Sequence, residues 1–411
     1  MTMPEQKKAV VPRLRFPEFR DAGPWEVKRV GYFLTESRID GSTGDIAKKL
    51  TVKLWGGGVV SKNEYLPGSP NTKYYRRKAG QFIYSKLDFL NGAFGIIPYE
   101  LDGYESTLDL PAFDFTKAIV PRFFLEYVKR PQFYKKHGEQ ADGSRKAKRI
   151  QVDYFLDLYV AVPCLAEQQK IADCLSSLDE LIELQAKKLE ALQAHKKGLM
   201  QQLFPREGET TPRLRFPEFR DAGPWEVKRL GDESVAKFIR DTAPRSDLHP
   251  ETYVSTENML PDFGGITQAS SLPASGTIKQ YRRQDILIAN IRPYLKKVWQ
   301  ADRNGTASND VIVVRPSSDI CPRYLGILLA SDTFISYVMA GAKGLKMPRG
   351  DIALIKQYPV GLPTKIAEQQ KIADCLSSLD ELIELQAKQL EALKAHKKGL
   401  MQQLFPQEID L

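Results

Sequence analysis

The sequence has few of the residues and motifs on which enzymes commonly depend. Its 411 residues include four cysteines and four histidines. No two cysteines are spaced as CxxC, which argues against a zinc ribbon or a redox pair. There is no GxxxxGK[ST] phosphate loop, no GxGxxG after a strand and no GxSxG elbow. These absences favour a binding protein over an enzyme, and we expect the chain itself to bind no metal or cofactor.

Long apolar runs are also absent. No run of 18 apolar residues occurs, so we expect no membrane span. The first residues, MTMPEQKKAVVPRLRF, contain no apolar core of a signal peptide. We therefore expect a cytoplasmic protein whose cysteines are buried, reduced thiols.

Two segments of the chain occur twice. Residues 166–205 return at 367–406 with two substitutions in 40 positions, and the 18-residue segment PRLRFPEFRDAGPWEVKR fills residues 12–29 and again 212–229. Between the copies lie two stretches of nearly equal length and different sequence, residues 30–165 and 230–366. The chain is therefore two modules, each with a constant leader, a variable domain and a constant final segment.

The repeated final segment has the heptad spacing of a coiled-coil helix. Eight of the ten seam positions in the first copy are apolar, and Gln185 and Gln386 fall inside the seams. One helix cannot bury so narrow a stripe alone, so we predict that the two copies pack against each other. The alternative is two separate helices, each packed on its own domain. The predicted apolar seam residues are Ile171, Leu175, Leu178, Ile182, Leu189, Leu192, Ile372, Leu376, Leu379, Ile383, Leu390 and Leu393.

The variable domains contain both helix and strand signals, which indicates an α+β fold. Residues 81–85 and 285–289 are apolar runs typical of buried strands. Residues 122–136 predict a helix that is interrupted at Pro131, and residues 322–341 predict a helix at the corresponding place in the second domain.

Basic residues are concentrated in these domains. The net charge of the chain is +9, yet each long helix has five lysines against six acidic residues, so the remainder has a charge of +11. Such an excess favours a polyanionic partner, nucleic acid before membrane.

Basic and aromatic residues occur at corresponding places in both domains. They lie before and just after the predicted buried strand, and again in a glycine-containing loop after the predicted helix. Arg, Lys and Tyr suit phosphate contacts, and Arg, Lys and Asn can read base edges in the major groove. The alternative for each group is a solvated surface. The predicted DNA-binding residues are Tyr74, Tyr75, Arg76, Arg77, Lys78, Ser85, Lys86, Arg145, Lys146, Lys148 and Arg149 in the first domain, and Tyr281, Arg282, Arg283, Asn290, Arg292, Lys343, Lys346 and Arg349 in the second.

The order of leader, domain and helix, repeated twice, resembles the DNA-specificity subunit of a type I restriction-modification system. The resemblance lies in PEFRDAGPWEVKRLG at the opening of the second domain and in LPTKIAEQQKIADCLSSLDELI at its end. It implies two mixed α/β target recognition domains separated by an antiparallel coiled coil with pseudo-twofold symmetry. The expected segments are 1–165 and 206–366 for the leaders and recognition domains, and 166–205 and 367–411 for the helices.

The resemblance also implies a function and partners. Each domain would recognise one half of a split, asymmetric site in double-stranded DNA. The helices would hold two methyltransferase subunits, and motor-nuclease subunits would join that core. S-adenosylmethionine, ATP and magnesium would belong to those partners, so this chain would be non-catalytic. The alternatives are a specificity subunit of another restriction class, a coiled-coil adaptor that does not read DNA, and an enzyme with an unfamiliar active site.

Overall fold

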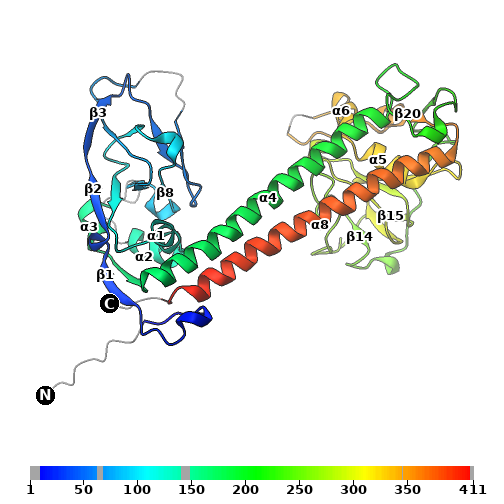
Figure 1. Ribbon diagram of the computed structural model, residues 1–411. Coiled ribbons are helices and arrows are strands. Elements are labelled where there is room, and N and C mark those ends of the chain that lie inside the picture. The colour runs from blue at the N-terminus through cyan, green and yellow to red at the C-terminus, as the bar shows by residue number, and fades with distance from the viewer. Residues whose placement is uncertain (1–9, 63–67, 140–148, 345, 408–411) are drawn as a thin grey trace. The chain divides into compact units, whose positions relative to one another are not determined.

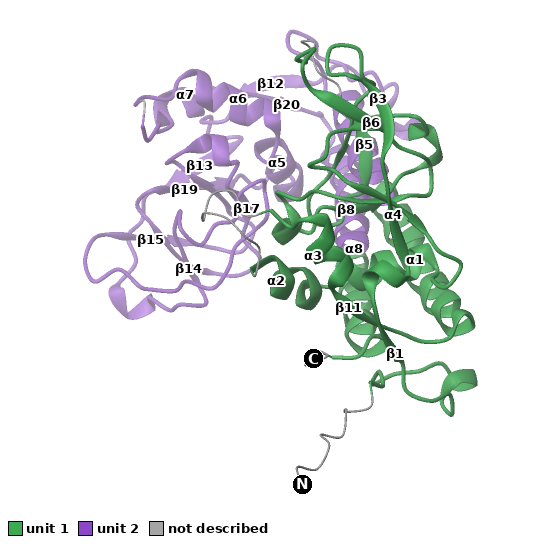
Figure 2. Cartoon of the chain, turned by 90° about the vertical axis from the view of Figure 1, so that its left-hand side faces the viewer, with its two compact units in different colours: residues 1–187, 388–411 green, residues 188–387 purple. Residues whose placement is uncertain are grey.

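The computed structural model describes residues 10–62, 68–139, 149–344 and 346–407. The chain forms two compact units (Figure 2): unit 1 contains residues 1–187 and 388–411, and unit 2 contains residues 188–387. Two helices of 39 residues, α4 (Leu165–Leu203) and α8 (Ile366–Leu404), run through both units (Figure 1). Each unit therefore holds one variable domain, the first half of one long helix and the last half of the other.

A four-stranded antiparallel sheet lies at the centre of unit 1. Its strand order is β2-β10-β7-β8, and Ala112 of β10 lies opposite both Ser37 and Ile83. Phe82 on β7 lies within a buried aromatic cluster with Phe124 and Phe155, which come from two of the helices. The elements are β2 (Leu34–Ser37), β7 (Phe82–Tyr84), β8 (Phe94–Ile96), β10 (Ala112–Phe115), α1 (Pro121–Val128), α2 (Pro131–Glu139) and α3 (Val152–Asp157).

Smaller sheets complete unit 1. The strand that ends the leader pairs with the strand that enters α4, so both ends of the domain meet at the helix. Unit 1 also contains a three-stranded sheet of order β3-β6-β9 and a two-stranded sheet of β4 and β5. The elements are β1 (Glu26–Arg29), β3 (Ile39–Thr43), β4 (Leu50–Val52), β5 (Val59–Ser61), β6 (Lys73–Arg76), β9 (Glu105–Ser106) and β11 (Tyr159–Val162).

Unit 2 repeats this plan with other residues. Its central sheet has the order β13-β19-β16-β17, and a smaller sheet has the order β14-β18-β15. The predicted helix at residues 322–341 is in fact two helices, because Ser331 begins the second one by accepting a hydrogen bond from the Phe334 N–H. The elements are β12 (Glu226–Arg229), β13 (Ala236–Ile239), β14 (Tyr253–Val254), β15 (Ile278–Tyr281), β16 (Ile286–Ala289), β17 (Val298–Gln300), β18 (Gly305–Ser308), β19 (Val311–Pro316), α5 (Pro322–Leu329), α6 (Asp332–Ala340), α7 (Ile352–Lys356) and β20 (Pro359–Leu362).

The two long helices pack against each other in antiparallel directions within each unit. In unit 1, Gln185 of α4 donates a hydrogen bond to Gln389 of α8 (3.2 Å). In unit 2, Lys196 of α4 pairs with Asp380 of α8. Every predicted seam residue is buried or half-buried, which confirms the coiled-coil prediction.

The ends of the seam also join the domain cores. Ile171 and Leu404 belong to the buried core of unit 1, and Ile372 and Leu203 belong to that of unit 2. Seam residues at the helix ends are thus part of the domain cores. Each long helix packs both on a domain and on the other helix, so the two alternatives do not exclude each other. The expectation of buried thiols is wrong for Cys164, which is exposed, whereas Cys321 is buried.

Candidate nucleic-acid interface

The central sheet of each domain brings charged residues together at one of its ends. In the first domain β2 and β7 are both antiparallel to β10, so these two strands end at the edge where β10 begins. Arg38 directly follows β2, Lys86 follows β7 by two residues, and Asp109 precedes β10. We call this group, together with Arg149, the sheet-end site of the first domain.

Backbone and side-chain contacts connect three of the four residues of this site. The Lys86 N–H donates to the Asp109 carbonyl (2.9 Å), and the Ile150 N–H donates to the Lys86 carbonyl (3.1 Å). Arg149 Nε lies 3.3 Å from Asp109 Oδ1. Burial lowers the pKa of the Lys86 ammonium; Asp109 and Glu36 oppose this shift, and Arg38 and Arg149 add to it. A half-buried cation thus lies at the end of the sheet among two carboxylates and two arginines.

The second domain has the same arrangement at the end of its sheet. The Asn290 N–H donates to the Asp310 carbonyl (2.8 Å), and the Gly350 N–H donates to the Asn290 carbonyl (3.1 Å). Arg349 Nη2 lies 3.1 Å from Asp310 Oδ1, and Arg240 directly follows β13. The sheet-end site of the second domain is therefore Arg240, Asn290, Asp310 and Arg349.

A buried or half-buried cation fixes the turn that carries the aspartate in each domain. Arg77, which is 1 % exposed, donates to the Ser37 carbonyl (2.8 Å) and the Leu110 carbonyl (3.1 Å). Burial lowers its pKa to about 10. Lys279 donates to the carbonyls of Asn309 (3.0 Å) and Val311 (2.8 Å). Arg77, which follows β6 in the first domain, and Lys279, which lies on β15 in the second, therefore support equivalent turns.

Three of the predicted DNA-binding residues lie inside their domains, so their prediction as surface contacts is wrong. One of them is Arg77, whose buried guanidinium donates to the Ser37 and Leu110 carbonyls. Tyr281 is fully buried, donates to the Thr252 carbonyl (2.9 Å), and has its pKa raised to about 12 by burial. Ser85 is 5 % exposed and donates to Asp88 Oδ2 (3.1 Å). All three belong to or flank strands, where successive side chains alternate between solvent and core.

The other predicted residues are at the surface or outside the described residues. Tyr74 and Tyr75 are half-buried, with the ammonium groups of Lys49 and Lys73 over their rings at 5.6 and 5.4 Å, respectively. Arg145, Lys146 and Lys148 lie outside the part of the chain that the structure describes. The exposed members of the predicted set are Arg76, Lys78, Arg149, Arg282, Arg283, Arg292, Lys343, Lys346 and Arg349.

In the second domain the strand-end and loop residues form one surface. Lys343 and Arg349 pair through their backbones across the loop, and Arg349 also forms a bridge to Ile291. The Arg292 N–H donates to the Pro348 carbonyl (2.8 Å) and holds Arg292 in a left-handed conformation with φ of 51°. Two clusters that are about 50 residues apart in sequence are therefore neighbours.

Arg38 and Arg240 were missed by sequence reasoning. Each is the first residue after the outer strand of its central sheet, and Arg38 makes a 2.8 Å ion pair with Glu36. Their place beside the other residues follows only from the strand order. The one signal in the sequence is a basic residue directly after a short strand in both domains.

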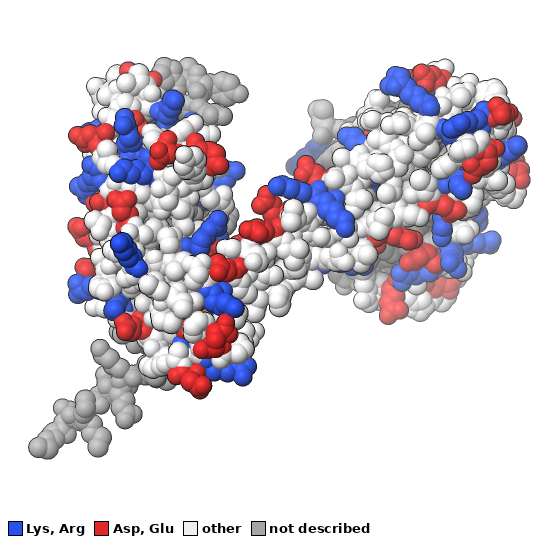
Figure 3. Space-filling view, viewed as in Figure 1, with Lys and Arg blue, Asp and Glu red and all other residues white. Residues whose placement is uncertain are grey.

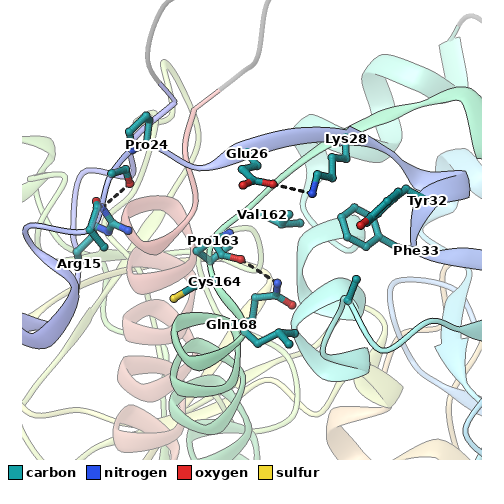
Figure 4. A pocket seen from close by; sticks show the side chains of 14 residues that line it. Arg15, Pro24, Glu26, Lys28, Tyr32, Phe33, Val162, Pro163, Cys164 and Gln168 are labelled. Atoms are coloured by element: carbon teal, nitrogen blue, oxygen red, sulfur yellow. Dashed lines mark hydrogen bonds and ion pairs between the residues drawn. The ribbon is translucent and has the colours of Figure 1, made fainter.

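The leader lines part of a hollow at the base of α4, where Gln168 donates to the Pro163 carbonyl at 2.9 Å (Figure 4). Arg15 makes a two-pronged ion pair with Glu167, at 2.8 and 2.5 Å. The second copy repeats the ion pair between Arg215 and Glu368 at 2.7 and 2.8 Å. These pairs are nearly inaccessible to solvent, so we assign them to anchoring the leader on the helix.

Charged side chains of both signs are interspersed over each unit on the face shown in Figure 3. Within the described residues, no group of three or more His, Cys, Asp or Glu side chains could hold a metal ion. No helix in that part of the chain is long and apolar enough to cross a membrane.

Comparisons with known proteins identify the family. The model of the type I restriction modification DNA specificity domain matches residues 117–194 and 223–395. The putative type I restriction enzyme MjaX specificity subunit of Methanocaldococcus jannaschii is 27 % identical over 304 residues, which cover 70 % of this chain and 67 % of the relative. The HindI specificity subunit of Haemophilus influenzae is 26 % identical over 193 residues, 44 % of this chain and 40 % of the relative. The chain thus spans about two thirds or less of these relatives.

Solved structures agree with this result at the level of the fold. The S subunit of a type I restriction-modification system from M. genitalium has a TM-score of 0.60 at 14 % identity, covering 97 % of this chain and 99 % of that one. A chain from a structural study of the assembly and conformational transition of the type I system has a TM-score of 0.52 at 17 % identity, covering 93 % and 98 %. The chain therefore belongs to the family of type I restriction modification DNA specificity domains, as a specificity subunit.

Proposed function

We propose that this specificity subunit recognises a split, asymmetric site in double-stranded DNA, with one half read by each domain. The main support is that the two domains share the sheet-end arrangement but differ in the residues that fill it. Arg149 with Asp109 and Arg349 with Asp310 are constant, whereas Lys86 is replaced by Asn290. The same arginine–aspartate pair beside a residue that differs suits two domains that bind DNA in the same way but recognise different sequences.

The long helices would set the unread spacer between the two halves. Each helix has 39 residues, about 58 Å at roughly 1.5 Å per residue. The near-identity of the two copies keeps this length the same for both domains. We expect that inserting one heptad into both helices changes the number of base pairs between the half-sites. An unchanged spacer would refute the proposal that helix length sets it.

The same helices would hold two methyltransferase subunits. Leu181 and Leu184 of α4 are 47 % and 63 % exposed, and their repeat equivalents Leu382 and Leu385 of α8 are 47 % and 50 % exposed. Two identical apolar patches suit two copies of one partner. Motor-nuclease subunits would then join this core in the cytoplasm, and S-adenosylmethionine, ATP and magnesium would be bound by the partners.

A domain exchange tests the proposed function. Residues 30–165 are replaced by the first variable domain of another family member, and the methylated sites are sequenced in a host that expresses the subunit with its methyltransferase. We expect one half of the site to change while the other half and the spacer stay the same. Changes in both halves would contradict one half-site per domain. Methylation without any sequence preference would favour an adaptor that does not read DNA.

A leucine substitution tests the docking. Leu184 and Leu385 are changed to Glu, separately and together, and co-purification of the methyltransferase is measured. We expect each single variant to bind one copy less tightly and the double variant to lose both copies. Full retention by the double variant would place the docking surface elsewhere.

A further inference from the structure

We propose that Lys86 and Asn290 occupy one equivalent base-reading position, at which Lys86 recognises guanine in one half-site and Asn290 recognises adenine in the other. This inference rests on the proposed function and deepens it, because it names the residue that makes the two half-sites differ. It depends on three observations: the equivalence of the two positions, the constancy of their surroundings and the chemistry of the two side chains.

Backbone contacts establish the equivalence of the two positions. Each residue follows the inner strand of its central sheet, β7 or β16, and donates its N–H to the carbonyl of an aspartate, Asp109 or Asp310. Each carbonyl accepts a hydrogen bond from the residue after an arginine, Ile150 or Gly350. The backbone is therefore held in the same way although the side chains differ.

The surroundings of the position are constant. The ion pairs Arg149–Asp109 and Arg349–Asp310 flank it, and all four of these side chains are between 40 % and 58 % exposed. The exposed arginines Arg38 and Arg240 follow the neighbouring strand. Exposed guanidinium groups at these places can contact phosphates, and such contacts carry no sequence information. They would therefore place the backbone of either half-site in the same way and leave discrimination to the residue between them.

Lys86 has the chemistry of a guanine contact. Its ammonium group offers only donors, and guanine presents two acceptors, O6 and N7, in the major groove. Lys86 is half-buried among two carboxylates and two arginines, and no ion pair or hydrogen bond of its ammonium group is found among the described residues. A base acceptor would supply the missing partner.

Asn290 has the chemistry of an adenine contact. Its Oδ1 is buried without a hydrogen-bond partner within the described chain, which is uncommon and requires an explanation. A Cβ at Gly350 would lie 2.8 Å from Oδ1, so the amide packs against bare backbone. Turning the amide toward DNA would break no internal bond at this oxygen. An outward amide accepts from adenine N6 and donates to N7.

Single substitutions in the assembled methyltransferase test the inference. The wild-type site is first defined by sequencing methylated DNA, and binding is then measured to duplexes varied one base pair at a time. We expect Lys86→Met to reduce discrimination at one guanine of one half-site by about 5- to 100-fold. Asn290→Ala should reduce discrimination to a similar extent at one adenine of the other half-site. Lys86→Arg should keep the preference for guanine.

The matched control is Lys117→Met. Lys117 is an exposed lysine beyond the opposite end of β10, so its loss should leave every base preference unchanged. A defined split site that keeps all its preferences in both Lys86→Met and Asn290→Ala would overturn the inference while the proposed function stands. A uniform loss of affinity for all sequences would also overturn it, since that result marks a phosphate contact. A wild-type protein without sequence preference would instead refute the proposed function.

Discussion

Lys397 Nζ of α8 lies 2.6 Å from Asp179 Oδ2 of α4 in unit 1. The repeat equivalents of these residues, Lys196 and Asp380, form the same ion pair in unit 2. Each helix therefore contributes an aspartate from its first half and a lysine from its second half. A parallel pair of identical sequences in register would place each aspartate beside its own equivalent. The duplicated pair is thus a consequence of antiparallel packing.

The two ion pairs should differ in their contribution to stability. Lys397 is 12 % exposed and also lies 3.2 Å from Glu126, which is 5 % exposed. Lys397→Met should lower the free energy of unfolding by about 2 kcal/mol, because the buried Glu126 then keeps, among the described residues, only Lys129 as a partner. Lys196 is 24 % exposed, and its partner Asp380 is 51 % exposed. Lys196→Met should therefore cost less than about 1 kcal/mol.

Urea denaturation of both variants measures this difference. The double variant Glu126→Gln with Lys397→Met should be more stable than Lys397→Met alone, since it removes a buried charge that has lost one of its two cationic partners. Equal losses for the two lysine variants would show that Glu126 does not depend on Lys397.

The leaders provide a second comparison, because their 18 residues are identical. Trp225 Nε1 donates to Glu368 (3.3 Å), whereas Nε1 of Trp25 is buried without a partner among the described residues. Both Trp→Phe substitutions remove the same apolar area. Trp225→Phe should therefore destabilise unit 2 by about 1–2 kcal/mol more than Trp25→Phe destabilises unit 1. Thermal unfolding of both variants measures this difference, and equal losses would contradict it.

The sequence predicted those parts of the fold that depend on local periodicity. Heptad spacing predicted α4, α8 and their seam, and apolar runs predicted β7 and β16. The burial of Arg77 and Tyr281 could not be predicted in this way. Both lie in basic, aromatic stretches that look like surface, and burial depends on contacts with segments about 30 residues away in each case.

The sheet-end sites were only partly predictable for the same reason. Lys86, Arg149, Asn290 and Arg349 were identified from residue type, but nothing in the sequence joined them. Their proximity results from the strand order β2-β10-β7 and its equivalent in unit 2, which pairs strands that are far apart along the chain. Arg38 and Arg240 were missed because their strands are short and carry no strong pattern.

Two adjacent arginines, Arg76 and Arg77, allow a DNA contact to be distinguished experimentally from a structural role. Arg76 is exposed on β6, whereas Arg77 is buried and donates to Ser37, Ser106 and Leu110. Arg77→Met should cost about 3 kcal/mol of stability, because buried acceptors lose their donor. Arg76→Met should change stability by less than about 0.5 kcal/mol. If Arg76 contacts phosphate, this variant should also reduce the slope of log affinity against log salt by about one.

Chemical denaturation and salt titrations of DNA binding measure these effects. Arg77→Met should keep the wild-type salt slope under conditions where it is folded. A reduced slope for Arg77→Met with an unchanged slope for Arg76→Met would show that the buried residue, not the exposed one, governs phosphate contact.

His137 should make the stability of unit 1 depend on pH. Burial, reinforced by Lys136, lowers the pKa of its imidazole to about 4 from the usual 6.5. The unfolded state therefore takes up a proton more readily than the folded state. The contribution of the neutral imidazole is complete above pH 6.5 and is lost progressively as the pH falls toward 4. The difference in unfolding free energy between wild type and His137→Gln should change over this range in favour of the variant. Replacement of the exposed His195 by Gln is the control, and a difference for His137→Gln that stays constant from pH 7 to pH 4 would show that the imidazole is protonated equally in both states.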